Sequence, residues 1–251
     1  MAKIDKAPKK KRKAGRVIMD IVVALVVLAL LGTAAWLLYK EFFPNNTPIL
    51  KMQVTKADKT IDWDALRAKN PETIGWLTID GTNIDTPVVQ TKDNNKYLYT
   101  AFDSSNDERG TPFLDMDYQW DPKSQNSVVY GHSTMRSGVP VMFDDLLNYV
   151  KDPTFIQKNG AITYNRPPEL GGDGTWAIFA VLTVEAETDY RQIDFPDQEQ
   201  FQSYYQGLKD ASIVKTDVTV APGDEIITLS TCIFNTGLSD GRLAVIAKRV
   251  K

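Results

Sequence analysis

The sequence predicts a mainly β fold, a small closed or near-closed barrel that follows a membrane-spanning helix. Three features of the chain predict it. A long apolar run lies near the N-terminus, about eight short apolar segments lie beyond it between turn clusters, and two or three stretches among them have helical spacing. Short strands in this number are typical of a closed barrel, and a β-sandwich is the alternative.

The N-terminal region carries a membrane signal. Residues 1–16 hold eight Lys or Arg and one acid, and residues 21–39 contain no charged residue. An uncharged run of about 20 residues is long enough to cross a bilayer, and its basic flank stays in the cytoplasm. We therefore expect a cytoplasmic segment at 1–20, an anchor in contact with membrane lipid at 21–39, and an extracellular remainder.

A cleaved signal peptide is the alternative to this anchor. The small residues Thr33, Ala34 and Ala35 stand at offsets that suit a cleavage site. The apolar run continues beyond them, however, and Trp36 and Tyr39 lie where an interfacial aromatic belt is expected. These two features favour the uncleaved anchor.

Charge is unevenly distributed along the chain. Of the 29 basic and 32 acidic residues, 21 and 31 lie beyond residue 16, which gives that part a net charge of −10. A nucleic-acid-binding domain needs a basic surface, so the acidic remainder argues against that class. The basic N-terminus is more simply a topology signal that also contacts anionic lipid.

The chain beyond the anchor divides into a linker and one domain. Residues 40–60 contain the sequence Pro-Asn-Asn-Thr-Pro and have the composition of a tether. Residues 61–251 are enough for a hydrophobic core of their own. One cysteine cannot form an internal disulfide, so this domain must rely on that core.

Helices are expected at three places in the domain. Residues 62–68 favour a short helix, which Asn70 and Pro71 end. Residues 143–150 and about 196–208 place apolar side chains at helical spacing and predict helices that face the core. Strands are expected in the apolar segments between turn clusters, at 74–79, 87–90, 112–115, 127–130, 161–164, 176–186, 226–232 and 242–250.

The domain contains the side chains needed for thiol catalysis. Cys232, the only cysteine, and His132, the only histidine, each end a predicted strand. If the loop at 233–241 returns the chain antiparallel, Arg242 starts the neighbouring strand beside the thiol. Positive charge stabilises a nucleophilic thiolate. Arginine also binds an oxyanion through a fixed fork, and histidine carries protons.

Inert roles for the same side chains are the alternative. A lone cysteine is usually a small buried hydrophobe, and the spacing alone does not show that the three residues meet. One cysteine and one histidine cannot build a typical zinc site. We therefore expect no metal and no cofactor.

These motifs resemble those of the sortases, cysteine transpeptidases on the surface of Gram-positive bacteria. The resemblance rests on Thr-Leu-Ser-Thr-Cys at 228–232, an arginine ten residues beyond it, Tyr-Gly-His at 130–132, and the basic-plus-apolar N-terminus. It covers about residues 61–251. It implies an eight-stranded sortase-like β-barrel in which this cysteine, histidine and arginine are catalytic.

Class B is the most similar class of sortase. The similar features are a helix before Asn-Pro-Glu-Thr-Ile-Gly-Trp at 70–76, the segment at 94–98, and a helix that follows the segment at 188–195. The resemblance implies that the sorting signal contacts Asn94, Leu98, Tyr190 and Ser230. Ordinary packing is the alternative, although strand alternation predicts an exposed Ser230 two residues before the thiol.

Two parts of the sequence depart from the class B pattern. Acidic or polar residues often follow the cysteine directly in that class, whereas this chain has Ile233, Phe234 and Asn235. Arg191 stands where an apolar residue is expected after Tyr190. Both departures concern the substrate sequence and leave the expected reaction unchanged.

The resemblance implies acyl transfer in two halves. The thiolate attacks the Thr carbonyl of an Asn-Pro-x-Thr sorting signal in a surface protein, and an amine of a peptidoglycan precursor then takes the acyl group from the thioester. A pilin lysine is the alternative acceptor. The remaining alternatives are a cysteine hydrolase, with water as acceptor, and a non-catalytic extracellular β-domain that binds a partner.

Overall fold

The computed structural model describes residues 19, 21–34, 61–133, 141–152, 154–234 and 236–251. They belong to two units, Met1–Pro48 and Ile49–Lys251. In the first unit residues 21–34 are helical. Within the described part of the chain, no helix combines the length and the hydropathy that a bilayer crossing requires. Most of the predicted segment 1–20, positions 35–39 of the predicted anchor and the predicted linker at 40–60 lie outside the described residues.

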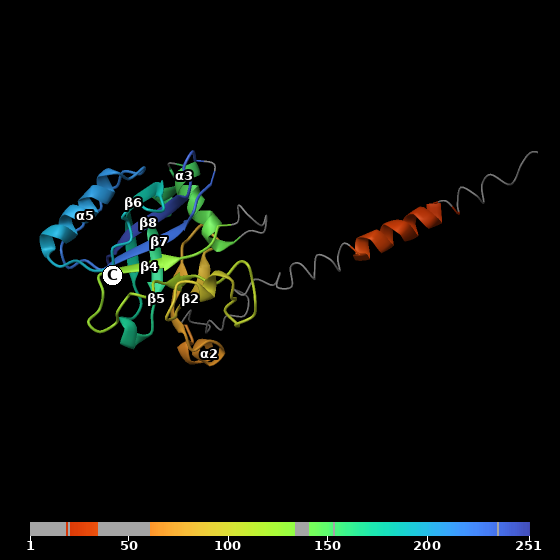
Figure 1. The fold of residues 1–251 in the computed structure, drawn as a ribbon, viewed down its shortest axis with the longest axis horizontal. Coiled ribbons are helices and arrows are strands. Elements are labelled where there is room, and N and C mark those ends of the chain that lie inside the picture. Colours follow the sequence, from red (N-terminus) through yellow and green to blue (C-terminus); the bar gives the residue numbers. More distant parts are fainter. Residues whose placement is uncertain (1–18, 20, 35–60, 134–140, 153, 235) are drawn as a thin grey trace, which may run out of the picture. The chain divides into compact units, whose positions relative to one another are not determined.

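Eight strands of the second unit close into one barrel (Figure 1). Around the barrel they follow the order β1-β2-β3-β4-β7-β8-β6-β5. The predicted closed barrel is therefore confirmed, and the sandwich alternative is wrong. Each strand begins and ends within two residues of its predicted position. The bounds are β1 Thr73–Thr78, β2 Asp85–Gln90, β3 Phe113–Leu114, β4 Asn126–Tyr130, β5 Ala161–Asn165, β6 Thr175–Glu185, β7 Ile226–Cys232 and β8 Gly241–Arg249.

The pairing of the strands brings distant parts of the chain together. Strands β4 and β7 pair in parallel, with Tyr130 opposite Ser230. Strands β7 and β8 pair antiparallel, with Cys232 opposite Arg242. The antiparallel return predicted for the loop at 233–241 is thus confirmed. The ends of β4 and β7, together with the start of β8, consequently lie side by side.

Helix α2, Trp63–Lys69, confirms the first predicted helix. Its N-cap Asp62 accepts a hydrogen bond from the Ala65 N–H through its side chain. The helix ends at Asn70, whose backbone is extended, as is usual before a proline. Three further short helices, which the sequence did not predict, are η2 Lys96–Leu98, α4 Phe155–Lys158 and η4 Pro168–Leu170.

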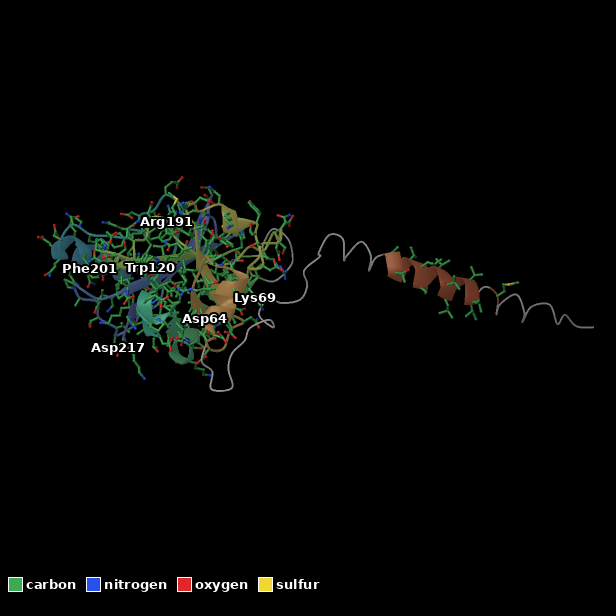
Figure 2. All side chains as sticks on the ribbon, turned by 90° about the horizontal axis from the view of Figure 1, so that it is seen from below. Asp64, Lys69, Trp120, Arg191, Phe201 and Asp217 are labelled. Carbon is green, nitrogen blue, oxygen red and sulfur yellow. The ribbon has the colours of Figure 1, made fainter. Side chains whose placement is uncertain are left out.

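Helix α5, Gln198–Asp210, confirms the helix predicted between the last long strands. Asp197 caps its start by accepting from the Gln200 N–H. The helix lies on the outside of the barrel (Figure 1), and the labelled Phe201 lies on it in Figure 2. Its apolar face packs against side chains of β6 and β8, and the helix side chains buried there are Phe201, Tyr205 and Leu208.

The region predicted as one helix at 143–150 differs from that prediction. A 3₁₀-helix, η3 (Met142–Leu147), comes first, and a single α-helical turn, α3 (Asn148–Lys151), follows it. In a 3₁₀-helix residues i and i+3 lie on the same face. Phe143 and Leu146 have this spacing and are both buried, so the tighter helix serves the same core contact.

A fully buried arginine lies among aromatic rings at one part of the barrel wall. The Arg166 guanidinium stacks on Tyr164 and Trp176, 5.5 and 5.3 Å from the ring centroids. Its Nη1 lies 2.7 Å from Oε1 of Glu225. A buried cation of this kind needs a charged partner, and Glu225 provides it.

Glu225 also contacts two less buried cations. Lys123 Nζ lies 2.7 Å from its Oε1, and Arg249 Nη1 lies 3.1 Å from its Oε2. Burial alone would raise the pKa of Glu225, but the Arg166 and Lys123 cations beside it lower that pKa from 4.5 to about 2. This carboxylate is therefore ionised at neutral pH and neutralises the buried guanidinium.

Candidate active site

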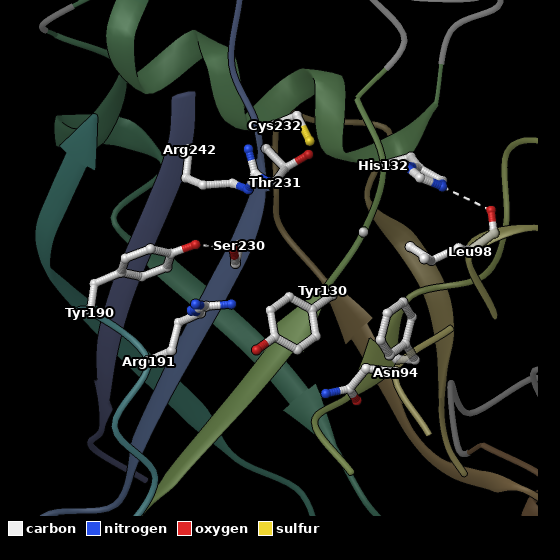
Figure 3. A pocket seen from close by; sticks show the side chains of 12 residues that line it. Asn94, Leu98, Tyr130, His132, Tyr190, Arg191, Ser230, Thr231, Cys232 and Arg242 are labelled. Atoms are coloured by element: carbon white, nitrogen blue, oxygen red, sulfur yellow. Dashed lines mark hydrogen bonds between the residues drawn. The ribbon is translucent and has the colours of Figure 1, made fainter. Parts of the chain in front are cut away.

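An open pocket of about 250 Å³ lies where β4, β7 and β8 meet (Figure 3). It collects side chains that are up to 148 positions apart in the sequence, from Asn94 to Arg242. All seven predicted site residues line it: Asn94, Leu98, His132, Tyr190, Ser230, Cys232 and Arg242. Five further residues complete the lining: Phe113, Tyr130, Gly131, Arg191 and Thr231.

Cys232 and Arg242 form the centre of this pocket. They are directly opposite each other on β7 and β8, and residues in that relation point to the same face of a sheet. Cys232 is half-buried and is not part of a disulfide. In Figure 3 Cys232 lies between Arg242 and His132. The thiol is therefore flanked by two groups that carry or accept positive charge.

Asp240 holds the guanidinium of Arg242. Arg242 Nη1 donates to Oδ1 of Asp240 over 2.5 Å, and Nη2 donates to Oδ2 over 3.2 Å. Partial burial would lower the pKa of Arg242, but the hydrogen bond that it donates to Asp240 and the charges of Cys232 and Asp240 raise that pKa above its usual value. Arg242 is accordingly a permanent cation beside the thiol.

His132 lies two residues beyond the end of β4. The ladder between β4 and β7 extends to the residue between them, because the Gly131 N–H donates to the Ser230 carbonyl over 3.1 Å. The Nε2 atom of His132 is 2.8 Å from the carbonyl oxygen of Leu98. A carbonyl oxygen only accepts, so Nε2 carries the hydrogen in this bond. Nδ1 is then the ring nitrogen left to exchange a proton.

Ser133 joins the His132 segment to the strand that carries the thiol. Its hydroxyl donates to the backbone carbonyl of Cys232 over 2.7 Å, and the side chain is nearly buried. Together with the extended ladder, this bond fixes the two chain segments relative to each other. The sequence analysis did not identify Ser133, although it directly follows His132.

The exposure predicted for Ser230 is wrong. Ser230 is only 3% exposed, and Tyr190, whose hydroxyl is next to it, is 1% exposed. The two hydroxyl oxygens lie 2.9 Å apart and form a hydrogen bond. These residues therefore act as one wall of the pocket, and strand alternation could not reveal the loop that covers the strand.

Asn94 is engaged by a loop below the pocket. Its Oδ1 accepts from the Met116 N–H over 2.9 Å, and its Nδ2 donates to Asp115 Oδ2 over 3.3 Å. Tyr130 donates its hydroxyl to the same Asp115 oxygen over 2.6 Å. Asn94 thus positions the floor of the pocket as well as lining it.

Tyr130 is a pocket residue that the sequence analysis missed. It lies two positions before His132, and strand alternation gave the signal that both point to one side. Thr231, next to Cys232, lines the pocket as well, and its buried hydroxyl has no hydrogen-bond partner among the described residues.

The described residues contain no group of three or more His, Cys, Asp or Glu side chains that could hold a metal ion. The chemistry that this pocket offers is that of a thiol, an imidazole and a guanidinium. Such a set suits nucleophilic attack on a carbonyl, with a proton carrier and an oxyanion partner at hand.

Comparison with known proteins identifies relatives of this arrangement. A family model described as the sortase domain matches residues 77–250. Sortase B of Listeria monocytogenes serovar 1/2a is 31% identical over 245 residues, which cover 90% of this chain and 94% of that protein. Sortase B of Staphylococcus aureus is 29% identical over 189 residues, which cover 75% of each chain.

Solved structures share the barrel. Sortase B of Clostridium perfringens is similar with a TM-score of 0.67 and 30% identity, over 76% of this chain and 100% of that one. The complex of Staphylococcus aureus sortase B with a substrate also gives a TM-score of 0.67, with 28% identity, over 75% of this chain and 84% of that one. The eight-stranded architecture described above is therefore that of these sortase B structures.

Proposed function

This chain belongs to the sortase family and is most similar to class B, and we propose that Cys232, His132 and Arg242 are its catalytic residues. As a family member it is a transpeptidase that acts on surface proteins. The observation that carries the assignment is the pairing of Cys232 with Arg242 across β7 and β8, with His132 in the same pocket.

In the first half of the proposed reaction, the Cys232 thiolate attacks the Thr carbonyl of an Asn-Pro-x-Thr sorting signal. A C–S bond forms, the C–N bond after Thr breaks, and His132 as imidazolium gives a proton to the leaving amine. Because Nε2–H of His132 is engaged by the Leu98 carbonyl, Nδ1 gives that proton. The product is a thioester.

Arg242 stabilises the oxyanion that forms during the attack. Its cation lies on the same face of the sheet as the thiol, and Asp240 orients the guanidinium. Charge fixed in advance at the place where an oxyanion develops lowers the barrier without reorganisation.

In the second half, an amine of a peptidoglycan precursor attacks the thioester. A C–N bond forms, the C–S bond breaks, and His132 takes the proton that the amine loses. The thioester conserves the reactivity of the acyl group until this amine arrives. No step requires a metal or a cofactor.

Four other pocket residues contact the part of the sorting signal before the scissile bond. Leu98 lies beside the imidazole on one side, and the joined pair of Tyr190 and Ser230 lies on the β7 side. Asn94 lines the floor. We assign these four residues to binding of the sorting signal and not to the chemistry.

We also propose an extracellular placement for the domain at 61–251. Residues 1–20 stay in the cytoplasm, 21–39 anchor the chain in the membrane, and 40–60 connect the anchor to the domain. The basic flank and the uncharged run in the sequence support this topology. Protease added to intact cells should digest the domain, whereas N-terminal sequencing that begins near residue 36 would instead indicate a cleaved signal peptide.

Mass spectrometry tests the reaction directly. The chain is incubated with an Asn-Pro-x-Thr peptide and an amine, and an acyl-enzyme and an amide product are expected. Release of the free acid in spite of the amine would indicate a hydrolase. A pilin lysine that outcompetes the cell-wall amine would identify a pilus-polymerising enzyme. Absence of any acyl-enzyme, with a thiol inert to a peptide-like alkylating agent, would leave a non-catalytic binding domain.

Cys232→Ala is the matched negative control, and it carries a prediction of its own. Both the acyl-enzyme and the amide product should disappear. Because the change removes one sulfur at a half-buried position, the free energy of unfolding should fall by no more than about 1–2 kcal/mol. Turnover above background in this folded variant would contradict the nucleophile assignment.

A further inference from the structure

Arg191 is a second cation in the pocket, on the side that is away from the thiol. It directly follows Tyr190, and its guanidinium stacks on the Tyr190 ring with 5.4 Å between its central carbon and the ring centroid. Nη2 has a long contact of 3.4 Å with the Ala186 carbonyl. The side chain is exposed, and it lines the same pocket as Cys232 (Figure 3). Figure 2 labels it on the whole domain.

Arg191 differs from the other described arginines in its partners. Each of the others lies within 4.0 Å of a carboxylate, whereas no described carboxylate lies that close to Arg191. The paired arginines are Arg67, Arg109, Arg166, Arg242 and Arg249. A cation that the fold leaves without a counter-ion, in the wall of a substrate pocket, is available to a charged group of a ligand.

Asp115, the carboxylate at the floor of the pocket, is not a counter-ion of Arg191. Asp115 is only 7% exposed, and its Oδ2 accepts from the Tyr130 hydroxyl and from Asn94. Its Oδ1 accepts from the Asp117 N–H. Asp115 therefore serves the floor of the pocket. The group that Arg191 contacts there is the neutral Tyr130 hydroxyl, which is no counter-ion for the guanidinium.

The place of Arg191 relative to the thiol limits which part of a substrate it meets. Tyr190 is hydrogen-bonded to Ser230, which is two residues before Cys232 on β7. At about 3.3 Å per residue, this separation is roughly 7 Å along the strand. A substrate bound in extended conformation, with its reactive carbonyl at the thiol, has the same rise per residue. A side chain two or three residues before that carbonyl therefore reaches Arg191.

We propose that Arg191 makes this enzyme select sorting signals with an Asp or Glu three residues before the attacked Thr carbonyl. The position two residues before it is the proline of the motif, which leaves the first motif position to present the carboxylate. The guanidinium fork, held against the Tyr190 ring, pairs with a carboxylate through two parallel hydrogen bonds. This inference rests on the proposed function of the same pocket.

Peptide substitution tests the selection. The parent enzyme should use Asp-Pro-x-Thr with a kcat/KM about three- to tenfold above that for Asn-Pro-x-Thr, the range between an exposed and a well-formed ion pair. Arg191→Gln should remove the preference, and Arg191→Glu should transfer it to a Lys-Pro-x-Thr peptide. Arg67→Gln makes the same charge change outside the pocket and should keep the preference of the parent.

Two results would overturn the proposal. The first is equal use of the Asp and Asn peptides by the parent enzyme, and the second is a preference that survives in Arg191→Gln. Raised salt should also shrink the preference of the parent, because the pair is exposed until substrate covers it.

The design separates this inference from the reaction itself. If the neutral Asn peptide is transferred but the Asp peptide has no advantage, only the role of Arg191 fails. If no peptide forms an acyl-enzyme, the proposed function fails, and binding of the three peptides to Cys232→Ala still measures the charge preference. Affinities that do not depend on residue 191 in that experiment would count against Arg191.

Discussion

In the proposed mechanism Arg242 has two partners, because Asp240 already holds the guanidinium that would bind the substrate oxyanion. A guanidinium satisfies both, since it presents five donors in one plane, whereas an ammonium presents three donors around one point. The identity of this residue therefore has consequences beyond its charge.

Arg242→Lys should retain the positive charge and still lose much of the activity. Loss of one oxyanion donor reduces the rate by about 100- to 1,000-fold in enzymes of this kind. Single-turnover formation of the acyl-enzyme measures the effect. A lysine variant as fast as the parent enzyme would show that position 242 supplies only a general positive field.

His132 should impose a bell-shaped pH dependence on kcat/KM. The proposed mechanism uses a thiolate and an imidazolium together, so activity should rise as the thiol ionises and fall as the imidazolium loses its proton. His132→Ala should nearly abolish transfer, because the sequence has no second histidine. A profile that rises monotonically, or an active alanine variant, would require another proton carrier.

At the scale of elements, the site depends on the close approach of the chain at the end of β4 to η3. A Cβ atom on Gly131 would come within 2.6 Å of the Phe143 ring on η3. The glycine therefore lets the residues just beyond β4, including His132, run close to that helix. Helix and strand together determine where the imidazole stands.

Gly131→Ala should consequently lower both stability and turnover. Extra volume in a packed region destabilises by about 1–3 kcal/mol, and displacement of His132 should reduce kcat more than it raises KM. Gly207→Ala is the matched control, because nothing lies within 4 Å of its Cβ position on α5. That control should be stabilised by about 0.5–1 kcal/mol, as measured by urea unfolding. Equal effects of both changes would argue against the clash.

The elements themselves could largely be predicted from the sequence. Apolar segments bounded by turn residues located all eight strands, because strand length and turn chemistry are local properties. The tighter 3₁₀ geometry of η3 was missed, since buried residues at i and i+3 fit either helix.

The spatial proximity of the site residues could be predicted only in part. Cys232 and Arg242 are joined by a short loop, and their pairing follows from an antiparallel return. His132 reaches them through the parallel pairing of β4 with β7, which no local periodicity specifies. The same applies to the contact between Tyr190 and Ser230, because it depends on a long segment folding over the strand.

At the scale of the whole molecule, the Glu225 cluster links stability to pH. The folded state lowers the pKa of Glu225 from 4.5 to about 2, so its stabilising contribution is complete above pH 4.5 and is lost as the pH falls towards 2. Part of this gain is offset, because burial and the charge of Arg166 lower the pKa of the neighbouring Lys123.

Glu225→Gln should destabilise the domain by about 3–5 kcal/mol at pH 7, because it leaves the buried Arg166 without its counter-ion. The difference from the parent should shrink between pH 4.5 and pH 2, where the parent loses the same charge. Urea unfolding at several pH values measures both effects. Glu169→Gln, which changes an exposed partner of Arg67, is the control and should alter stability little at any pH. A difference that stays constant down to pH 2 would contradict the linkage.

The position of β8 in the barrel has a consequence for the time at which the enzyme becomes active. β8 is the eighth strand in chain order, yet it lies between β6 and β7 and brings Arg242 to the thiol. A chain whose synthesis has not yet reached residue 241 lacks this strand, so its barrel cannot close and Cys232 has no arginine beside it. With the proposed catalytic residues, activity should therefore begin only when the final strand closes the sheet.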